Sequence, residues 1–266
     1  MAGGMAALPL MLPSPLCAAS NEHHHRQSTS PKAGFFANAY ICESLDSCIL
    51  IDAHLTPEQA KSVALKIQEI RKPLAAIVIT HPHPDHYLGL EHLGPMFPDA
   101  VIAGSNACLE VIKDAAFGWD GFDNSVRVLQ SGAVTFADIE LECLVLQDAE
   151  SIGPIVLHDA ATKTLVAGDH VLNGQHLWLA EDRIHAWQEN LTDIAHRWDI
   201  EHVFPGHGDE GGRELITETN KYLEVFQQAK SKRLSMDEVR QIMLETFPNH
   251  VFAEALETSL AVHFTT

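Results

Sequence analysis

A histidine-rich loop that directly follows an apolar run constrains this chain more than any other feature. Residues 74–79 are continuously apolar between Pro73 and Thr80, which is typical of a strand buried on both faces. Residues 80–86 then read Thr-His-Pro-His-Pro-Asp-His. A solvated polar loop is the alternative, but burying this cluster without a metal would leave several polar groups to satisfy. The ligands expected from this loop are His81, His83, Asp85 and His86.

The rest of the chain alternates strand-like and helix-like segments. Apolar runs flanking polar turns predict hairpins over 39–51 and 155–167. Thr56-Pro57-Glu58-Gln59 is a capping-box start followed by one apolar helical stripe. Further strands are expected within 100–103, 126–146 and 202–204, and helices within 105–113, 184–198, 236–245 and 253–261. This order predicts an α/β fold with two mixed sheets and helices outside.

Two more ligands are expected at strand ends, because four residues cannot complete two metal shells. Asp169 follows the run 164–167 after a glycine, and His207 lies in the sequence Phe-Pro-Gly-His-Gly. Each pattern alone is more often a simple turn. Their joint occurrence after the histidine loop favours a shared metal site, in which His81 and His83 face one point and Asp85 and His86 face another.

Charge and composition narrow the partners. The chain has 36 acidic and 17 basic residues, a formal charge of -19 that repels nucleic acid and anionic membranes. No apolar run is long enough to span a membrane. The five cysteines show no CxxC spacing, so reduced and mostly buried thiols are expected. Nucleic acid and anionic membranes are therefore not expected as partners.

The N-terminal residues are expected to lie outside the folded unit. Residues 1–20 are apolar and end in small residues like a signal peptide, but they lack a basic start and contain three prolines. The polar stretch 21–32 predicts a solvated tail, with loose metal binding by its His triplet as the alternative. The expected organisation is a mobile segment 1–33 and a single domain 34–266 with C-terminal helices from about 211. The expected location is cytoplasmic, or secreted or periplasmic if the apolar stretch is a signal.

These motifs resemble the metallo-β-lactamase-fold superfamily over about residues 38–208. The family's HxHxDH signature is matched by residues 81–86, its bridging aspartate by Asp169, its late histidine by His207 and its early strand-ending aspartate by Asp52. The resemblance implies a four-layer αββα sandwich with the site at one edge between the sheets. It also implies two divalent ions per chain, Zn²⁺ first, with other transition ions as alternatives.

The chain departs from the family pattern at one position. The family carries a histidine in a Pro-Gly-His-Thr turn as third ligand of the first metal, and alignment back from Gly153 puts Glu150 there. A carboxylate can ligate zinc, and alkylsulfatase-like branches of the family use glutamate. The added charge should weaken activation of bound water and make Mn²⁺ or Fe²⁺ more competitive. A surface Glu150, with Asp148 or no residue as ligand, is the alternative.

The resemblance implies a hydrolase in which hydroxide bound by a binuclear centre attacks a small ester, lactone, thioester or amide. Asp85 would orient that hydroxide and pass a proton to the leaving group. Three alternatives stay open: a mononuclear iron oxygenase resembling the persulfide dioxygenases, an alkylsulfatase-like sulfate ester hydrolase, and a protein that binds metal without catalysis.

Candidate substrate-binding residues lie in two segments: one follows Asp169, and the other precedes the predicted hairpin 39–51. Asn173, His176 and Trp178 lie in a polar and aromatic stretch after Asp169, where a packing loop is an equal alternative. Phe35 and Phe36 could cover an apolar substrate, although core packing is the default. The C-terminal helices are expected to pack on the core or on a second subunit, which would make a homodimer.

Overall fold

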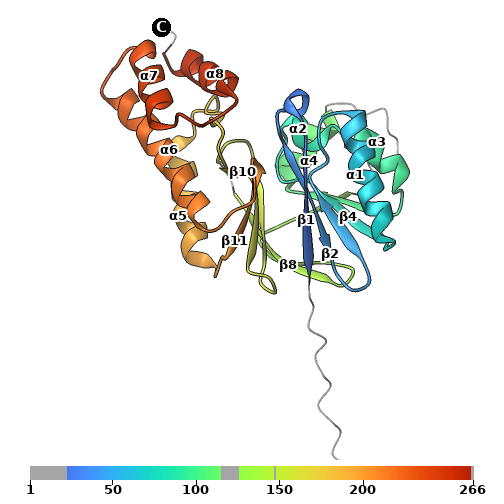
Figure 1. The fold of residues 1–266 in the computed structure, drawn as a ribbon. Coiled ribbons are helices and arrows are strands. Elements are labelled where there is room, and N and C mark those ends of the chain that lie inside the picture. Colours follow the sequence, from blue (N-terminus) through green and yellow to red (C-terminus); the bar gives the residue numbers. More distant parts are fainter. Residues whose placement is uncertain (1–22, 115–125, 147, 265–266) are drawn as a thin grey trace, which may run out of the picture.

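The computed structural model describes residues 23–114, 126–146 and 148–264, which form two β-sheets between two layers of helices (Figure 1). The first sheet has the strand order β1-β2-β3-β4-β5-β6, and the second has the order β11-β10-β9-β8-β7. Pairing is parallel from β3 to β6 and between β10 and β11, and antiparallel elsewhere. Both sheets are therefore mixed, as the sequence predicts.

The first half of the chain builds the first sheet with its helices, and the second half builds the second. The first half contains β1 (His24–Thr29), the 3-10 turn η1 (Lys32–Gly34), β2 (Asn38–Glu43), β3 (Cys48–Ile51), α1 (Pro57–Ile70), β4 (Leu74–Val78), α2 (Pro84–Tyr87), α3 (Leu90–Met96), β5 (Val101–Gly104), α4 (Asn106–Asp114) and β6 (Val126–Val128). The second half contains β7 (Gly132–Phe136), β8 (Ile139–Val145), β9 (Ile155–Asp159), β10 (Thr164–Leu172), α5 (Ile184–Arg197), β11 (His202–His207), α6 (Glu214–Ser231), α7 (Met236–Thr246) and α8 (Ala253–Phe264).

Strand alternation divides the apolar residues among three cores. In β3, Leu50 faces the core shared with α1, α3 and α4, whereas Ile49 and Ile51 face the core between the sheets. A third core packs the second sheet against α5 and the C-terminal helices, with Trp187 and Phe226 among its largest side chains. Since successive strand residues point to opposite faces, an unbroken apolar run serves two cores at once. The result is the four-layer αββα sandwich.

Most predicted elements are confirmed, and the capping box of α1 is present with Thr56 and Gln59 bonded reciprocally. The expected solvated tail is wrong from His24 onward. Residues His24–Thr29 form β1, which pairs antiparallel with β2 at the edge of the first sheet. The part of the prediction on residues 1–22 lies outside the described residues. Within the described ranges, no helix combines the length and apolarity needed to cross a membrane.

Four polar segments meet at one edge of the sandwich because of this topology. Asp52 follows β3, the histidine loop follows β4, and His207 ends β11. Asp169 lies within β10, where the pairing with β11 is irregular. The carboxyl ends of parallel neighbours lie at the same sheet edge, so residues far apart in sequence are brought together there.

Candidate metal centre

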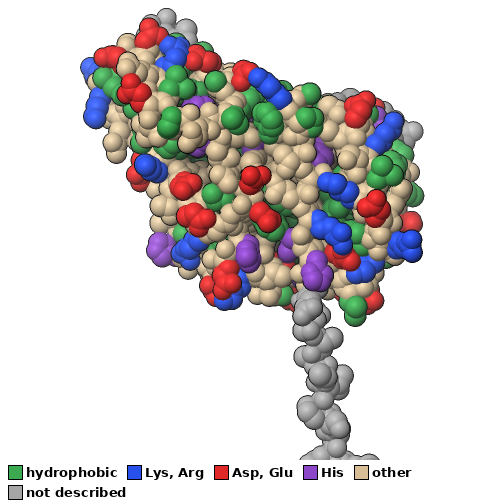
Figure 2. Space-filling model, in the orientation of Figure 1, with side chains coloured by type: hydrophobic (Ala, Val, Ile, Leu, Met, Phe, Trp, Pro, Cys, Tyr) green, Lys and Arg blue, Asp and Glu red, His purple; other side chains and the backbone are tan. Residues whose placement is uncertain are grey.

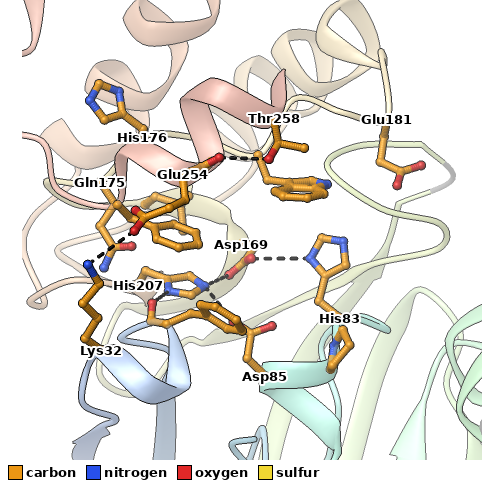
Figure 3. A pocket seen from close by; sticks show the side chains of 16 residues that line it. Lys32, His83, Asp85, Asp169, Gln175, His176, Glu181, His207, Glu254 and Thr258 are labelled. Carbon is orange, nitrogen blue, oxygen red and sulfur yellow. Dashed lines mark hydrogen bonds and ion pairs between the residues drawn. The ribbon is translucent and has the colours of Figure 1, made fainter. Parts of the chain in front are cut away.

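Asp169 lies between two groups of histidine nitrogens. Its Oδ2 lies 3.4 Å from His81 Nε2 and 3.7 Å from His83 Nδ1. Its Oδ1 lies 3.2 Å from both His86 Nε2 and His207 Nε2. One carboxylate oxygen thus faces each group, and Figure 3 shows Asp169, His83 and His207 turned toward one another.

Asp85 belongs to the second group. Its Oδ2 lies 3.5 Å from His207 Nε2 and 3.7 Å from His86 Nε2. The ligand atoms of these three residues lie within 4.8 Å of one another, as do those of His81, His83 and Asp169. The structure therefore brings together six of the predicted metal ligands in two adjacent sets.

Hydrogen bonds to the outer ring nitrogens orient the histidines of the second group. His86 Nδ1 donates to Asp52 Oδ2 at 2.9 Å, and His207 Nδ1 donates to the carbonyl oxygen of Phe35 at 2.8 Å. A proton held on Nδ1 leaves the Nε2 lone pair of each ring facing inward. Such outer partners are a general feature of metal-ligating histidines.

Thr80 couples the two groups. Its hydroxyl donates to Asp52, with oxygen distances of 2.8 and 3.0 Å, and accepts from His81 Nδ1 at 2.9 Å. The Thr80 backbone N–H also donates to Asp52 at 2.8 Å. Asp52 has a positive φ of 62°, a conformation uncommon outside glycine that places its carboxylate against both partners. Sequence reasoning identified Asp52 but missed Thr80.

Glu150 is buried, with 2% of its surface exposed, and neither of its carboxylate oxygens has a hydrogen-bond partner. Burial acts to lower the pKa of His83, but the carboxylates of Asp169 and Glu150 raise it above its ordinary value. The alternative that Glu150 is a surface residue is therefore wrong. The alternative ligand Asp148 is 59% exposed at its side chain and lies 3.5 Å from Arg183.

The donor set fits divalent cations. Buried His81 Nε2 and Asp169 Oδ1 have no hydrogen-bond partner, like both oxygens of Glu150, and unpartnered buried polar atoms are costly. Asp52, Asp85, Glu150 and Asp169 are four buried carboxylates with a formal charge of -4. Two divalent ions would balance that charge, whereas neutral imidazoles do not.

Electrostatics at the site also favours positive charge. Burial acts to lower the pKa of His86, but the carboxylates of Asp169, Asp85 and Asp52 raise it well above its ordinary value. Burial acts to raise the pKa of Asp169, but the neighbouring histidines hold it well below its usual range. The site thus stabilises cations against the cost of burying them.

Glycine at position 206 lets the backbone of β11 approach Asp169. A Cβ atom there would lie 2.0 Å from Asp169 Oδ1 and 2.6 Å from the Gly168 carbonyl carbon. Gly168 itself has a φ of 52°, and a Cβ on it would lie 2.6 Å from Thr80 Oγ1. Neither position has room for a side chain, which explains the glycines beside both strand-end ligands.

A cavity of about 470 Å³ opens above the two ligand groups. Its floor includes His83, Asp85, Asp169 and His207, and Figure 3 shows its roof formed by the segment around Glu254 and Thr258. The other lining residues are Lys32, Phe35, Pro84, Leu172, Gln175, His176, Trp178, Glu181, Phe252 and Ala255. The walls are mainly apolar, and Lys32 Nζ lies 3.3 Å from Glu254 Oε1 across the cavity.

The substrate-binding predictions need correction at two positions. Trp178 and His176 line the cavity, but Asn173 does not, because its amide donates to the carbonyl of Asp209. Phe35 lines the cavity in place of Phe36. The buried ring of His176 hydrogen-bonds Tyr222 Oη at 2.9 Å, and in Figure 3 it lies apart from Asp169 and His207.

The roof of the cavity is the part that sequence reasoning missed. Phe252, Glu254, Ala255 and Thr258 come from the start of α8 and the residue before it. The sequence shows an amphipathic helix here but carries no signal that separates a core contact from a cavity wall. The ring contact of Phe35 with Phe252, with centroids 5.5 Å apart, joins this roof to the N-terminal half.

A family model described as the metallo-beta-lactamase superfamily matches residues 33–207, more than half of the chain. The chain therefore belongs to the metallo-β-lactamase superfamily. The matched range contains all seven predicted metal ligands but ends before α6, so the helix that roofs the cavity lies outside it.

Solved structures with the same fold include metallo-beta-lactamases. The enzyme from Pontibacter korlensis is 18% identical with a TM-score of 0.63, covering 76% of this chain and 99% of that one. The DIM-1 metallo-beta-lactamase is also 18% identical, with a TM-score of 0.59 and coverage of 74% and 91%. At these identities the likeness shows the fold alone. Among curated proteins, the Uncharacterized protein YobT of Bacillus subtilis (strain 168) is 37% identical over 76 residues, which span 29% of this chain and about a third of that protein.

Proposed function

We propose that this chain is a metal-dependent hydrolase with a binuclear centre, acting on a small ester, lactone, thioester or amide. The observation that carries the proposal is the position of Asp169, with one carboxylate oxygen facing each group of histidines. A mononuclear centre held by the first group would leave Asp85, His86 and His207 without a role as metal ligands. The first ion would be held by His81, His83 and Glu150, and the second by that group, with Asp169 shared.

When bound, the ions would polarise a substrate oxygen and lower the pKa of a water molecule toward neutrality. Zn²⁺ suits the imidazole nitrogens, and the carboxylate of Glu150 makes Mn²⁺ or Fe²⁺ competitive. Asp85 lines the cavity floor with its carboxylate at the second group. There Oδ2 would orient the attacking water, accept its proton and return it to the leaving group.

The cavity supports a substrate with an apolar group. Phe35, Leu172, Trp178 and Phe252 would contact that group, since a largely apolar wall with few polar residues is typical of small-molecule sites. The acidic side chains of Glu181 and Glu254 at the wall disfavour a substrate with a second negative charge. A neutral carbonyl compound fits this cavity better than a sulfate ester does.

The test combines chelation with Asp85→Asn. Turnover of a panel of lactones, thioesters, β-lactams and aryl sulfates should disappear on metal removal and return with Zn²⁺, Mn²⁺ or Fe²⁺. Asp85→Asn should lower kcat by about 10² or more, whereas Asp99→Asn, an exposed carboxylate in a turn, should not. Full turnover by metal-free protein would refute the proposal, and dioxygen consumption would support the oxygenase instead.

A further inference from the structure

A second cluster of metal-ligating side chains lies at the opposite edge of the sandwich. The ligand atoms of His23, Cys42 and Asp159 lie within 4.8 Å of one another, and His25 contacts both Asp159 and Cys42 beside them. We call these four residues the edge cluster. The candidate metal centre lies at the carboxyl ends of β3, β4 and β11. The edge cluster lies at the other end of the strands, where β1 and β10 begin. Figure 2 shows several exposed histidine side chains on the lower part of the molecule, whereas the side chains of His23 and His25 are buried.

Strand geometry explains why these residues converge. His23 and His25 are two positions apart, so an extended chain directs both side chains to one face. Cys42 of β2 is the direct cross-strand partner of His25. Asp159 ends β9 in the other sheet, so the cluster closes the space between the two sheets.

The contacts in the edge cluster are close and buried. Asp159 Oδ2 lies 2.8 Å from His23 Nδ1 and 2.9 Å from His25 Nε2. Cys42 Sγ lies 4.0 Å from His25 Nε2, and Thr162 Oγ1 donates to Asp159 at 2.9 Å. The side chains of His23, His25 and Asp159 are 2%, 5% and 1% exposed. The other ring nitrogens, His23 Nε2 and His25 Nδ1, are buried and have no hydrogen-bond partner.

We propose that the edge cluster binds one divalent transition-metal ion of the zinc class, with His23, His25, Cys42 and Asp159 as its four ligands. A set of two imidazoles, a thiolate and a carboxylate selects Zn²⁺ or a similar ion over Mg²⁺ and Ca²⁺. The ligand atoms of His23, Cys42 and Asp159 already lie within 4.8 Å of one another, and His25 Nε2 lies 2.9 Å from Asp159 Oδ2 and 4.0 Å from Cys42 Sγ. On binding they would rearrange around an ion at ordinary bond lengths of about 2.0–2.3 Å.

Protons and charges balance when a divalent ion binds to the edge cluster. The Cys42 thiol loses its proton to solvent, and each imidazole carries its proton on the nitrogen that has no partner in the metal-free protein. The thiolate and the Asp159 carboxylate then neutralise the divalent charge. Burial raises the pKa of the Cys42 thiol well above its ordinary value, so binding should release a proton near neutral pH.

An ion bound at the edge cluster would have a structural role. β1 is an edge strand paired only with β2, and the edge cluster joins it to the second sheet through Asp159. A metal that binds the folded state stabilises it in proportion to its affinity. Metal at this site would therefore hold the N-terminal strand in place and keep the two sheets together at the edge far from catalysis.

Cobalt substitution tests the site without any measure of activity. The predicted ligands of the catalytic centre are nitrogen and oxygen atoms, so a thiolate-to-Co²⁺ charge-transfer band reports the edge cluster alone. Titration of the full chain with Co²⁺ should produce this near-ultraviolet band. Cys42→Ser should abolish the band and bind one equivalent of Co²⁺ fewer than the wild-type chain.

Matched variants separate the site from other thiols. Cys143→Ser, which changes another buried cysteine of the inter-sheet core, and Cys17→Ser should both keep the band. Asp159→Asn serves as a second ligand variant, because it retains the side-chain shape and should still lose the bound equivalent. A wild-type chain without the band, or a band that persists in Cys42→Ser, would overturn the proposal and leave a hydrogen-bonded cluster only.

Discussion

The hydroxyl of Thr80 connects one histidine of each group, His81 and His86, through a single oxygen atom. It accepts a hydrogen bond from His81 and donates to Asp52, which in turn holds His86. Thr80→Val keeps the shape of the side chain but leaves His81 Nδ1 without a partner. We expect metal affinity to fall roughly 10- to 100-fold, the usual effect of losing an outer hydrogen bond to a ligand.

Thr80→Ser is the matched control because it retains the hydroxyl. Competition with a chelator of known affinity measures the metal dissociation constant of each variant. Equal constants for Thr80→Val and the wild-type chain would show that the hydroxyl does not position the ligands.

Glu150 distinguishes this chain from the common family pattern at the level of one residue. Glu150→Ala should lose the ion that we propose it holds with His81 and His83, since it removes a buried carboxylate whose two oxygens have no hydrogen-bond partner. Glu150→His should retain the ion, bind Zn²⁺ in preference to Mn²⁺, and move the acid limb of the pH–rate profile to lower pH.

Metal analysis of the purified variants decides this prediction. Asp148→Ala is the control, since that exposed carboxylate lies near Arg183 and should leave the metal content unchanged. If both Glu150 variants keep the metal content and the pH–rate profile of the wild-type chain, Glu150 is not a metal ligand.

Helix α8 determines how much of the cavity a substrate can occupy. Thr258 lines the cavity from this helix, and its hydroxyl donates to the Glu254 carbonyl at 2.9 Å within the same turn. Thr258→Trp places a large ring in the cavity, so KM for bulky substrates should rise roughly 10-fold or more. Metal content should stay unchanged because Thr258 is not near the ligand atoms.

Val262→Trp adds the same ring to an exposed position of α8 and should leave KM unchanged. Steady-state kinetics with a short and a long substrate of one class provides the comparison. Equal KM values for Thr258→Trp and the wild-type chain would show that α8 does not limit the substrate.

The free energy of unfolding of the whole molecule should depend on pH through the buried His176. Burial, followed by repulsion from His250, lowers the pKa of His176 from 6.5 to about 4. The unfolded chain then binds a proton more readily than the folded one. Stability is therefore fully present above pH 6.5 and is lost as the pH falls toward 4, by about 3 kcal/mol in total.

His176→Gln removes this titration, so its free energy of unfolding should decline less steeply between pH 6.5 and 4 than that of the wild-type chain. The control is His185→Gln, on the exposed face of α5. Denaturant unfolding at several pH values measures the slope. Parallel slopes for His176→Gln and the wild-type chain would contradict a neutral buried imidazole.

Local patterns in the sequence were sufficient for most of the elements and for most of the residues that the structure brings together at the candidate metal centre. The apolar runs predict the buried strands, and the residues that follow them identify the histidine loop and His207, because a strand end fixes where the next side chains lie. The capping box at Thr56 and Gln59 predicts the start of α1, since both hydrogen bonds form within one turn. These signals need no knowledge of distant contacts.

Features that depend on distant partners were decided only by the tertiary structure. The residues of β1 read as a polar tail because their inward-facing partner, Asp159, lies far along the chain. The burial of Glu150 and the outward turn of Asp148 follow from packing around a short loop, which composition does not reveal. The roof over the candidate metal centre depends on the contact of Phe35 with Phe252, the residue before α8. An amphipathic helix specifies that one face is buried, whereas only the packed molecule specifies what that face covers.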